Sequence, residues 1–293
     1  MDIWFILINA VVLATIYGTL AIGISITWSS LGLLNLSYGF IFAFAGYGAF
    51  LAAQYISPWG GVVLAAGIMT GVLGGIIVCL LAFIPIHDKP NFTMRGMIAT
   101  LAINLIGTQA LLWWFGPRAK NLPPVFGNWK VSLGDLTLTA DKAGGILSAI
   151  LMLVIVLRWM QSSRRGLEIR AMMMNPHAAS IVGIGVRRTS FYVMSITGGL
   201  AGLAAVLLSN TYYISPFGGL MPMIKGVSIA LCGGLGSVRG AVIAAGVLGL
   251  NEALTNVSIG GRYVLITQFL LIIAILLVRP RGIAGLLDRA REA

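Results

Sequence analysis

The chain has 293 residues, of which 58% are hydrophobic and only 9% are charged, and its mean hydropathy is +0.97. Soluble domains carry about 25% charged residues, so this composition excludes an ordinary soluble protein and indicates a polytopic helical membrane protein. The net charge of +11 gives no reason to expect nucleic acid as a partner, because the basic residues gather at the ends of apolar segments, where they set the orientation of spans.

Nine apolar segments follow one another along the chain, and several exceed the roughly 18–20 residues needed to cross a bilayer. The second and seventh are interrupted by glycine and serine, so we expect broken helices there and eight or nine transmembrane segments in all. The predicted fold is an all-α membrane helical bundle that forms one domain over residues 1–293. The segments cover residues 4–28, 30–54, 61–85, 97–115, 144–160, 189–209, 222–237, 239–257 and 262–278.

Polar side chains interrupt the second apolar segment. Asn35, Ser37 and Tyr38 lie just before Gly39, within an otherwise apolar stretch. Irregular backbone and polar groups at membrane depth are tolerated only where they are buried in protein or line a water-filled cavity. This break is therefore expected either to line a cavity or to form hydrogen bonds between helices.

Two later segments carry further polar positions. Thr100 and Asn104 are four residues apart, so they share one face of the fourth segment and can point inward together. Glu252 is the one acidic residue expected near membrane depth, which makes it a candidate functional group. Helix packing, a gate and contact with a solute are all open roles for Glu252.

The longest charged interruption of the chain is at residues 161–188. Asn175 followed by Pro176 is a helix-start pattern, and Gly183 is placed to end that helix. Residues 166–174 predict another short helix just before it. We expect two short helices beneath the membrane that dock a cytoplasmic partner, and an ordinary basic loop is the alternative.

The distribution of lysine and arginine predicts the orientation of the chain. With residues 161–188 in the cytoplasm, the larger share of the 19 basic residues also lies inside, which predicts an external N-terminus and a cytoplasmic C-terminus. Lys225 has no clear side. The longest outer loop, residues 116–142, is either a face for an external partner or a solvated connector.

The two halves of the chain share a similar sequence pattern. Ser29–Gly48 and Lys225–Gly249 are both glycine-rich, interrupted spans, and they lie on either side of the charged segment. Internal repeats with paired broken helices are common in transporters, where the substrate path lies at their junction. The sequence thus suggests an internal repeat.

No catalytic or cofactor-binding pattern is found in the sequence. Gly234-Leu-Gly236 lacks the third glycine of a dinucleotide fingerprint, and no phosphate loop occurs. The two histidines, His87 and His177, are far apart in sequence, so we expect no metal cluster. The chain is expected to be neither an enzyme nor the holder of a cofactor.

Four motifs, in order, carry a resemblance to a known family. Residues Arg170–Val186 resemble the cytoplasmic coupling segment of permeases of the branched-chain amino acid (Liv-type) ABC importers. Gly32–Gly39, Lys225–Glu252 and Arg279–Gly285 resemble that family's early Asn-Leu, late Gly-Gly-x-Gly-Ser and closing Arg-Pro-x-Gly elements. The resemblance spans nearly the whole chain, and the length suits the shorter of the two permeases in such importers.

The resemblance implies a permease subunit in the bacterial inner membrane, surrounded by membrane lipid. Its partners would be a second, homologous permease, two ABC ATPase subunits that hydrolyse ATP, and a periplasmic substrate-binding protein. The solute would be a branched-chain or other hydrophobic amino acid, or a related small organic molecule. An ion-coupled secondary transporter and a non-transporting membrane scaffold are the alternatives, and the shortage of acidic residues at membrane depth disfavours the first.

The resemblance also assigns roles to residues. The family often has His or Gln where this chain has Tyr38, which leaves the identity of the solute open. The residues expected to couple to the ATPases are Arg170, Ala171, Asn175, Pro176, His177, Ala179 and Gly183. Polarity within apolar spans, together with the early and late motifs, gives the residues expected along the translocation path: Asn35, Ser37, Tyr38, Gly39, Thr100, Asn104 and Glu252.

Overall fold

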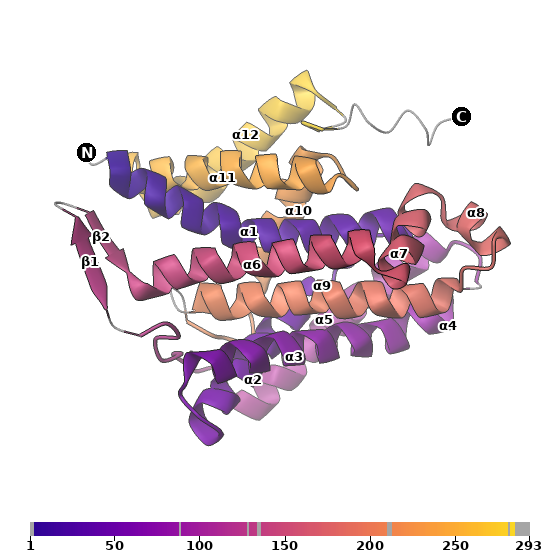
Figure 1. Cartoon of the computed structure of the whole chain (residues 1–293), viewed down its shortest axis with the longest axis horizontal. Coiled ribbons are helices and arrows are strands. Elements are labelled where there is room, and N and C mark those ends of the chain that lie inside the picture. The colour runs from indigo at the N-terminus through magenta and orange to yellow at the C-terminus, as the bar shows by residue number, and fades with distance from the viewer. Residues whose placement is uncertain are drawn as a thin grey trace.

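The computed structural model describes residues 3–87, 89–127, 129–133, 136–209, 213–280 and 282–284. Its helices lie side by side in one elongated bundle (Figure 1). Seven helical segments of the described chain are long and apolar enough to cross a membrane. They are α1 (Ile3–Leu31), α3 with the π-helical turn η1 and α4 (Gly60–Ile86), α5 (Phe92–Phe115), α6 (Ala140–Ser162), α9 (Val186–Ser209), α11 (Val238–Ser258), and η2 with α12 (Gly261–Val278).

Two further apolar helices, α2 (Tyr38–Tyr55) and α10 (Leu220–Gly233), follow irregular backbone. Residues 32–37 form the first break, before α2, and residues 213–219 form the second break, before α10. Gly32 has a φ of +69°, a left-handed conformation that favours glycine, and α2 begins only at Tyr38. The 14 residues of α10 extend over about 21 Å, less than the roughly 30 Å of the hydrocarbon core. The predicted interruption of the second apolar segment is confirmed. Within the predicted seventh segment, residues 222–237, α10 is unbroken up to Gly233 and ends where Gly234 has a φ of +94°.

The centre of the bundle is α9, of whose apolar span 78% is buried, whereas the corresponding share is 22% or less for α5, α6 and α12. Glycine lets α9 approach α3 closely. A Cβ atom added to Gly71 would lie 2.4 Å from the carbonyl oxygen of Gly198, so neither helix tolerates a side chain at this contact. Small residues serve the same purpose at helix contacts in lipid, where backbones approach closely.

The loop between α5 and α6 contains a short antiparallel hairpin, which the sequence did not predict. Strands β1 (Lys130–Leu133) and β2 (Leu136–Thr139) pair with Lys130 opposite Thr139. Lys120, earlier in the same loop, exchanges two backbone hydrogen bonds of 2.8 and 2.9 Å with Ile214, just before α10. The hairpin lies near the start of α1, at one end of the bundle (Figure 1).

The opposite end of the bundle carries α7 (Arg164–Met174) and α8 (Pro176–Ile181), near α4 (Figure 1). The closing motif folds back onto the end of α10. The backbone nitrogens of Ile283 and Ala284 donate to the carbonyl oxygens of Cys232 and Gly233 at 2.8 and 3.1 Å. Arg281 and Gly285 of that motif lie outside the described residues.

Candidate functional site

The short helix α7 is anchored to the bundle by apolar side chains on one face. Ile169 and Met172 are fully buried and Met173 is partly buried. Arg170 lies on the exposed face, where its guanidinium donates to the carbonyl oxygen of Gln161 at 3.0 Å. The helix is therefore fixed to the membrane domain while its charged face stays accessible.

The start and end of α8 are built as the sequence predicts. The side-chain oxygen of Asn175 accepts hydrogen bonds from the backbone nitrogens of His177 and Ala178, both at 3.0 Å. This cap satisfies two donors that the first turn of a helix leaves without partners. Pro176 occupies the first helical position, and Gly183, with a φ of +87°, ends the turn after the helix.

The residues expected to couple to ATPases are divided between surface and core. Arg170, Asn175, His177 and Gly183 are exposed, and Ala171 and Pro176 are half-buried. Ala179 is only 4% exposed and packs into the hydrophobic core, so it seats α8 on the bundle. Their coupling role stays a prediction.

Sequence reasoning missed the most exposed apolar side chains of this segment. Met174, Ile181 and Val182 are 78%, 75% and 76% exposed, at the end of α7 and the end of α8. The available signal was two adjacent aliphatic residues at the edge of an otherwise polar segment. These three residues, with exposed His177 and Ala178, are called the α8 surface below.

The polar residues before α2 are buried and bonded to their neighbours. The side-chain oxygen of Asn35 accepts from the backbone nitrogen and from the hydroxyl of Ser37, at 3.0 and 2.5 Å. The hydroxyls of Tyr38 and Thr27 are 3.2 Å apart, which joins the start of α2 to α1. All four side chains are at most 1% exposed.

Thr100 and Asn104 of α5 accept hydrogen bonds from backbone nitrogens in this break and in the first turn of α2. Thr100 Oγ1 accepts from the nitrogen of Leu36 at 3.1 Å, and Asn104 Oδ1 accepts from the nitrogen of Phe40 at 2.7 Å. Both side chains point inward from one helix face, as predicted. The bonds satisfy donors freed where the chain leaves helical geometry.

Gly39 and Asn104 also line a cavity of about 120 Å³, together with Phe217 and Leu220 from the segment that leads into α10. The two interrupted elements meet here. A Cβ atom on Gly219 would lie only 1.9 Å from the carbonyl oxygen of Gly39. Whether these residues line the translocation path stays a prediction. The contact between the two breaks is observed in the fold.

A buried ion pair lies beside the second break. Lys225 of α10 places its ammonium nitrogen 2.7 Å from each carboxylate oxygen of Glu252 on α11 and 2.9 Å from the hydroxyl of Tyr17 on α1. The residues are at most 9% exposed. Glu252 is a predicted site residue, whereas Lys225 was missed as its partner. The available signal was a lone lysine within an apolar helix.

This ion pair forms part of the wall of a cavity of about 650 Å³, which is within the size range of small-molecule sites. Tyr17 and Asn256 add polar groups, and much of the remaining lining is apolar, including Met221, Val264 and Leu265. We refer to it as the Lys225 cavity. It combines a few convergent polar groups with apolar walls, which is the usual composition of a small-molecule site.

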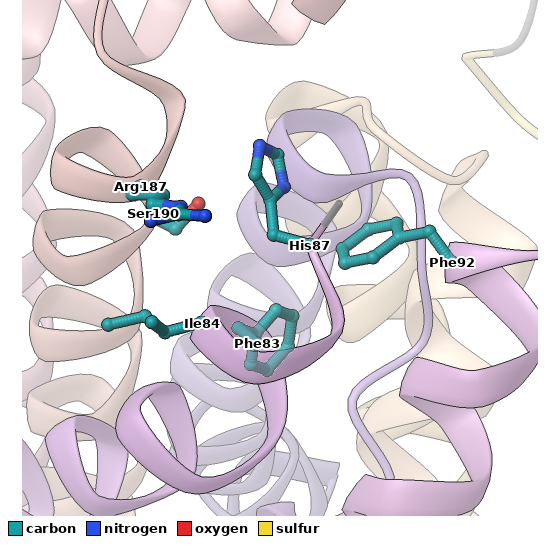
Figure 2. Close-up of a pocket in the computed structure, with 6 residues that line it drawn as sticks. All are labelled: Phe83, Ile84, His87, Phe92, Arg187 and Ser190. Atoms are coloured by element: carbon teal, nitrogen blue, oxygen red, sulfur yellow. The ribbon is translucent and has the colours of Figure 1, made fainter. Parts of the chain in front are cut away.

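His87 lies at the end of α4, beside a cavity of only about 10 Å³, which is the space of about one water molecule. Figure 2 shows its ring between Phe92 of α5 and the segment of α9 that carries Arg187 and Ser190. The other histidine, His177, is on the exposed surface of α8. Among the residues that the structure describes, no three His, Cys, Asp or Glu side chains are grouped as metal ligands.

Comparison with known proteins supports a transport role. The family described as the permease component of the branched-chain amino acid transport system matches residues 6–276. The chain is 27% identical to the high-affinity branched-chain amino acid transport system permease protein LivH of Escherichia coli K12, over 94% of each chain. The guanosine ABC transporter permease protein NupP of Bacillus subtilis is 36% identical over 180 residues, which are 58% of this chain and 51% of NupP.

A solved structure, PsaBC from Streptococcus pneumoniae in complex with Fab, has a similar fold. The TM-score is 0.53 over 95% of this chain and 92% of that chain, at 13% sequence identity, so the likeness concerns the fold alone. The family match covers nearly the whole chain. The chain therefore belongs to the branched-chain amino acid transport system permease family and is a multi-pass permease subunit of an ABC importer in the inner membrane.

Proposed function

We propose that this chain forms the membrane path of its importer together with a second, homologous permease. Two ABC ATPase subunits bind at the α7–α8 end, and a periplasmic substrate-binding protein delivers the solute at the hairpin end. The observation behind this proposal is the α8 surface, which is largely apolar, exposed and joined to the bundle through buried Ala179.

The α8 surface has the properties of a docking site that transmits force. Ile181 and Val182 are about three-quarters exposed, although contact of apolar side chains with water is unfavourable. Ala179, on the same short helix, is buried against the bundle, so a displacement of α8 also displaces the helices beneath it. Adaptable Met174 adds to the contact area that a partner groove would cover.

The same proposal fixes the orientation of the chain. The basic residues of the α7–α8 segment belong on the cytoplasmic side, since cytoplasmic loops carry an excess of lysine and arginine. The N-terminus and the hairpin lie at the other end of the bundle and are then external (Figure 1). The C-terminus is cytoplasmic.

ATP binding would draw the two ATPases together and pull the α8 surfaces of the two permeases with them. That rigid-body movement would switch the path from inward-facing to outward-facing. We propose a small molecule without net charge as the solute. Branched-chain and other hydrophobic amino acids are the first candidates, since the LivH relative is named for branched-chain amino acids and the NupP relative for guanosine.

Co-purification from the native host membrane tests the assignment. Tagged wild-type chain should retain two ATPases and a second permease, identified by mass spectrometry. Ile181→Asp places a charge on the α8 surface and should release the ATPases, while the second permease stays bound. Ile259→Asp is the matched control, because this residue is also exposed but follows α11 at the opposite end of the bundle.

Retention of the ATPases by Ile181→Asp would show that α8 is not their docking site. A wild-type chain that purifies alone, and that moves solute in liposomes along an ion gradient, would instead support the secondary-carrier alternative.

A further inference from the structure

The ion pair of Lys225 and Glu252 is at the middle of the membrane domain. Tyr17, which contacts both charged residues, is the central residue of the 29-residue helix α1, which spans about 43 Å. The hydroxyl of Tyr17 is 3.3 Å from Glu252 Oε1 and 2.9 Å from Lys225 Nζ, so the three groups form one closed triad. Ionisable groups at this depth are costly and generally mark a functional pathway.

Helix packing alone does not explain the triad. A buried ion pair loses about as much hydration energy as it gains in attraction, and apolar side chains of similar volume would hold two helices together equally well. The pair is also not sealed in the core. The side chain of Lys225 is 11% exposed and that of Glu252 is 4% exposed, and both form part of the cavity wall.

The Lys225 cavity has polar and apolar lining residues. A cationic, an anionic and a phenolic group lie within hydrogen-bond distance of one another. The apolar lining includes Met221 and Leu265. This arrangement matches a small molecule that carries both charges at one end and an apolar group at the other.

We propose that Lys225, Glu252 and Tyr17 form a contact site for the solute, at which each charge of a zwitterionic amino acid pairs with a group of this triad. This inference rests on the proposed function of the chain as a solute path. No bond is made or broken in the step. The solute carboxylate accepts from Lys225 and Tyr17, its ammonium group donates to Glu252, and its side chain contacts the apolar wall.

The exchange keeps every charge paired. In the empty state Lys225 and Glu252 neutralise each other, and in the loaded state each has a charge of the solute beside it. A solute with a net charge would leave one group unmatched in a low-dielectric interior, which is strongly unfavourable. The site thus admits solutes without net charge and opposes the leakage of ions.

The test uses the whole importer in proteoliposomes, with L-leucine as the labelled probe. Lys225→Met/Glu252→Leu removes both charges and keeps apolar volume, so the complex should assemble and hydrolyse ATP while leucine uptake falls at least about tenfold. The control is Asn9→Leu/Lys142→Met, which removes another polar contact between helices, 2.9 Å long, between residues that do not line the cavity. Uptake by the control should stay within about twofold of wild type.

A second variant keeps the ion pair and reduces the cavity. Met221→Trp enlarges a half-exposed wall residue and should also lower leucine uptake about tenfold. Val242→Trp, a similarly exposed position on α11, is its control. This variant decides the question if the double variant fails to assemble.

Unchanged leucine uptake in either cavity variant would overturn the site. A wild-type complex that assembles and hydrolyses ATP but imports guanosine and no leucine would overturn the zwitterion assignment and leave the permease function intact. Failure of the wild-type chain to assemble with ATPases would instead contradict the proposed function.

Discussion

The two breaks in the bundle treat their polar groups in opposite ways. Before α2, the side chains of Asn35, Thr100 and Asn104 hydrogen-bond groups within the break, and the cavity beside it holds only about 120 Å³. Beside α10, Lys225 and Glu252 bond each other and line a cavity of about 650 Å³. Polar residues at membrane depth thus accept hydrogen bonds from the backbone before α2, whereas beside α10 they line a larger cavity.

A polar residue in an apolar span is therefore not sufficient to identify a site. The informative observation is what else the polar group could contact. At the first break, Asn35, Thr100 and Asn104 accept from main-chain donors, which must find a partner within the protein at membrane depth. At the second, the polar groups are side chains at the wall of a cavity, where a solute can compete for them.

The largest effect is expected from separating the buried charges. Lys225→Met leaves Glu252 without its cation and should lower the free energy of unfolding by about 3–5 kcal/mol. Lys225→Met/Glu252→Leu should recover most of that loss, because no buried charge remains. Unfolding of the purified chain in detergent by heat or denaturant measures both. A double variant as unstable as the single one would show that the pair itself holds the helices together.

The junction between the two breaks should be the next most sensitive position. Gly219→Ala places a Cβ atom against the Gly39 carbonyl oxygen and should cost about 1–3 kcal/mol of stability, because backbone atoms must move. Gly246→Ala is the control, since it meets no atom within 4 Å and replaces a helical glycine. The control should be neutral or stabilising by up to about 1 kcal/mol. Equal behaviour of the two variants would deny that the breaks are tightly joined.

Loss of one hydrogen bond to the backbone of the first break should lower stability by a smaller amount. Thr100→Val keeps the side-chain shape but leaves the backbone nitrogen of Leu36 without its acceptor, at a cost of about 1–2 kcal/mol. Thr108→Val, two turns along the same helix, is the comparison variant and should change stability by less than about 0.5 kcal/mol. Solute uptake, corrected for the amount of folded protein, should be unchanged by Thr100→Val. A selective loss of uptake would place Thr100 in the path after all.

The smallest change in stability is expected at the α7–α8 end of the bundle. Asn175→Ala removes the cap of α8 and should cost about 1 kcal/mol locally, which loosens the α8 surface and weakens ATPase binding. Asn175→Asp keeps an oxygen acceptor for the same two nitrogens and should restore binding. Pull-down of the ATPases by tagged variants measures both. Full binding by Asn175→Ala would show that the cap is irrelevant to docking.

Much of the fold could be predicted because its signals are local. Apolar length fixed the spans, and Asn175, Pro176 and Gly183 fixed α8, since a helix cap depends on a few adjacent residues. The triad could not be predicted in the same way. Lys225 is 27 residues from Glu252 and 208 from Tyr17, and only the packing of three helices brings them together. The contact of Gly39 with Gly219 depends on tertiary structure for the same reason.

The energy source for uptake separates an ABC importer from a secondary carrier. Liposomes are prepared with the purified complex of this chain, its partner permease and the ATPases. The binding protein and labelled L-leucine are added on the side of the membrane that the hairpin end faces. The account predicts that leucine accumulates only when ATP is supplied on the α7–α8 side, whatever the ion gradient. Accumulation without ATP, driven by a proton or sodium gradient through this chain alone, would contradict it.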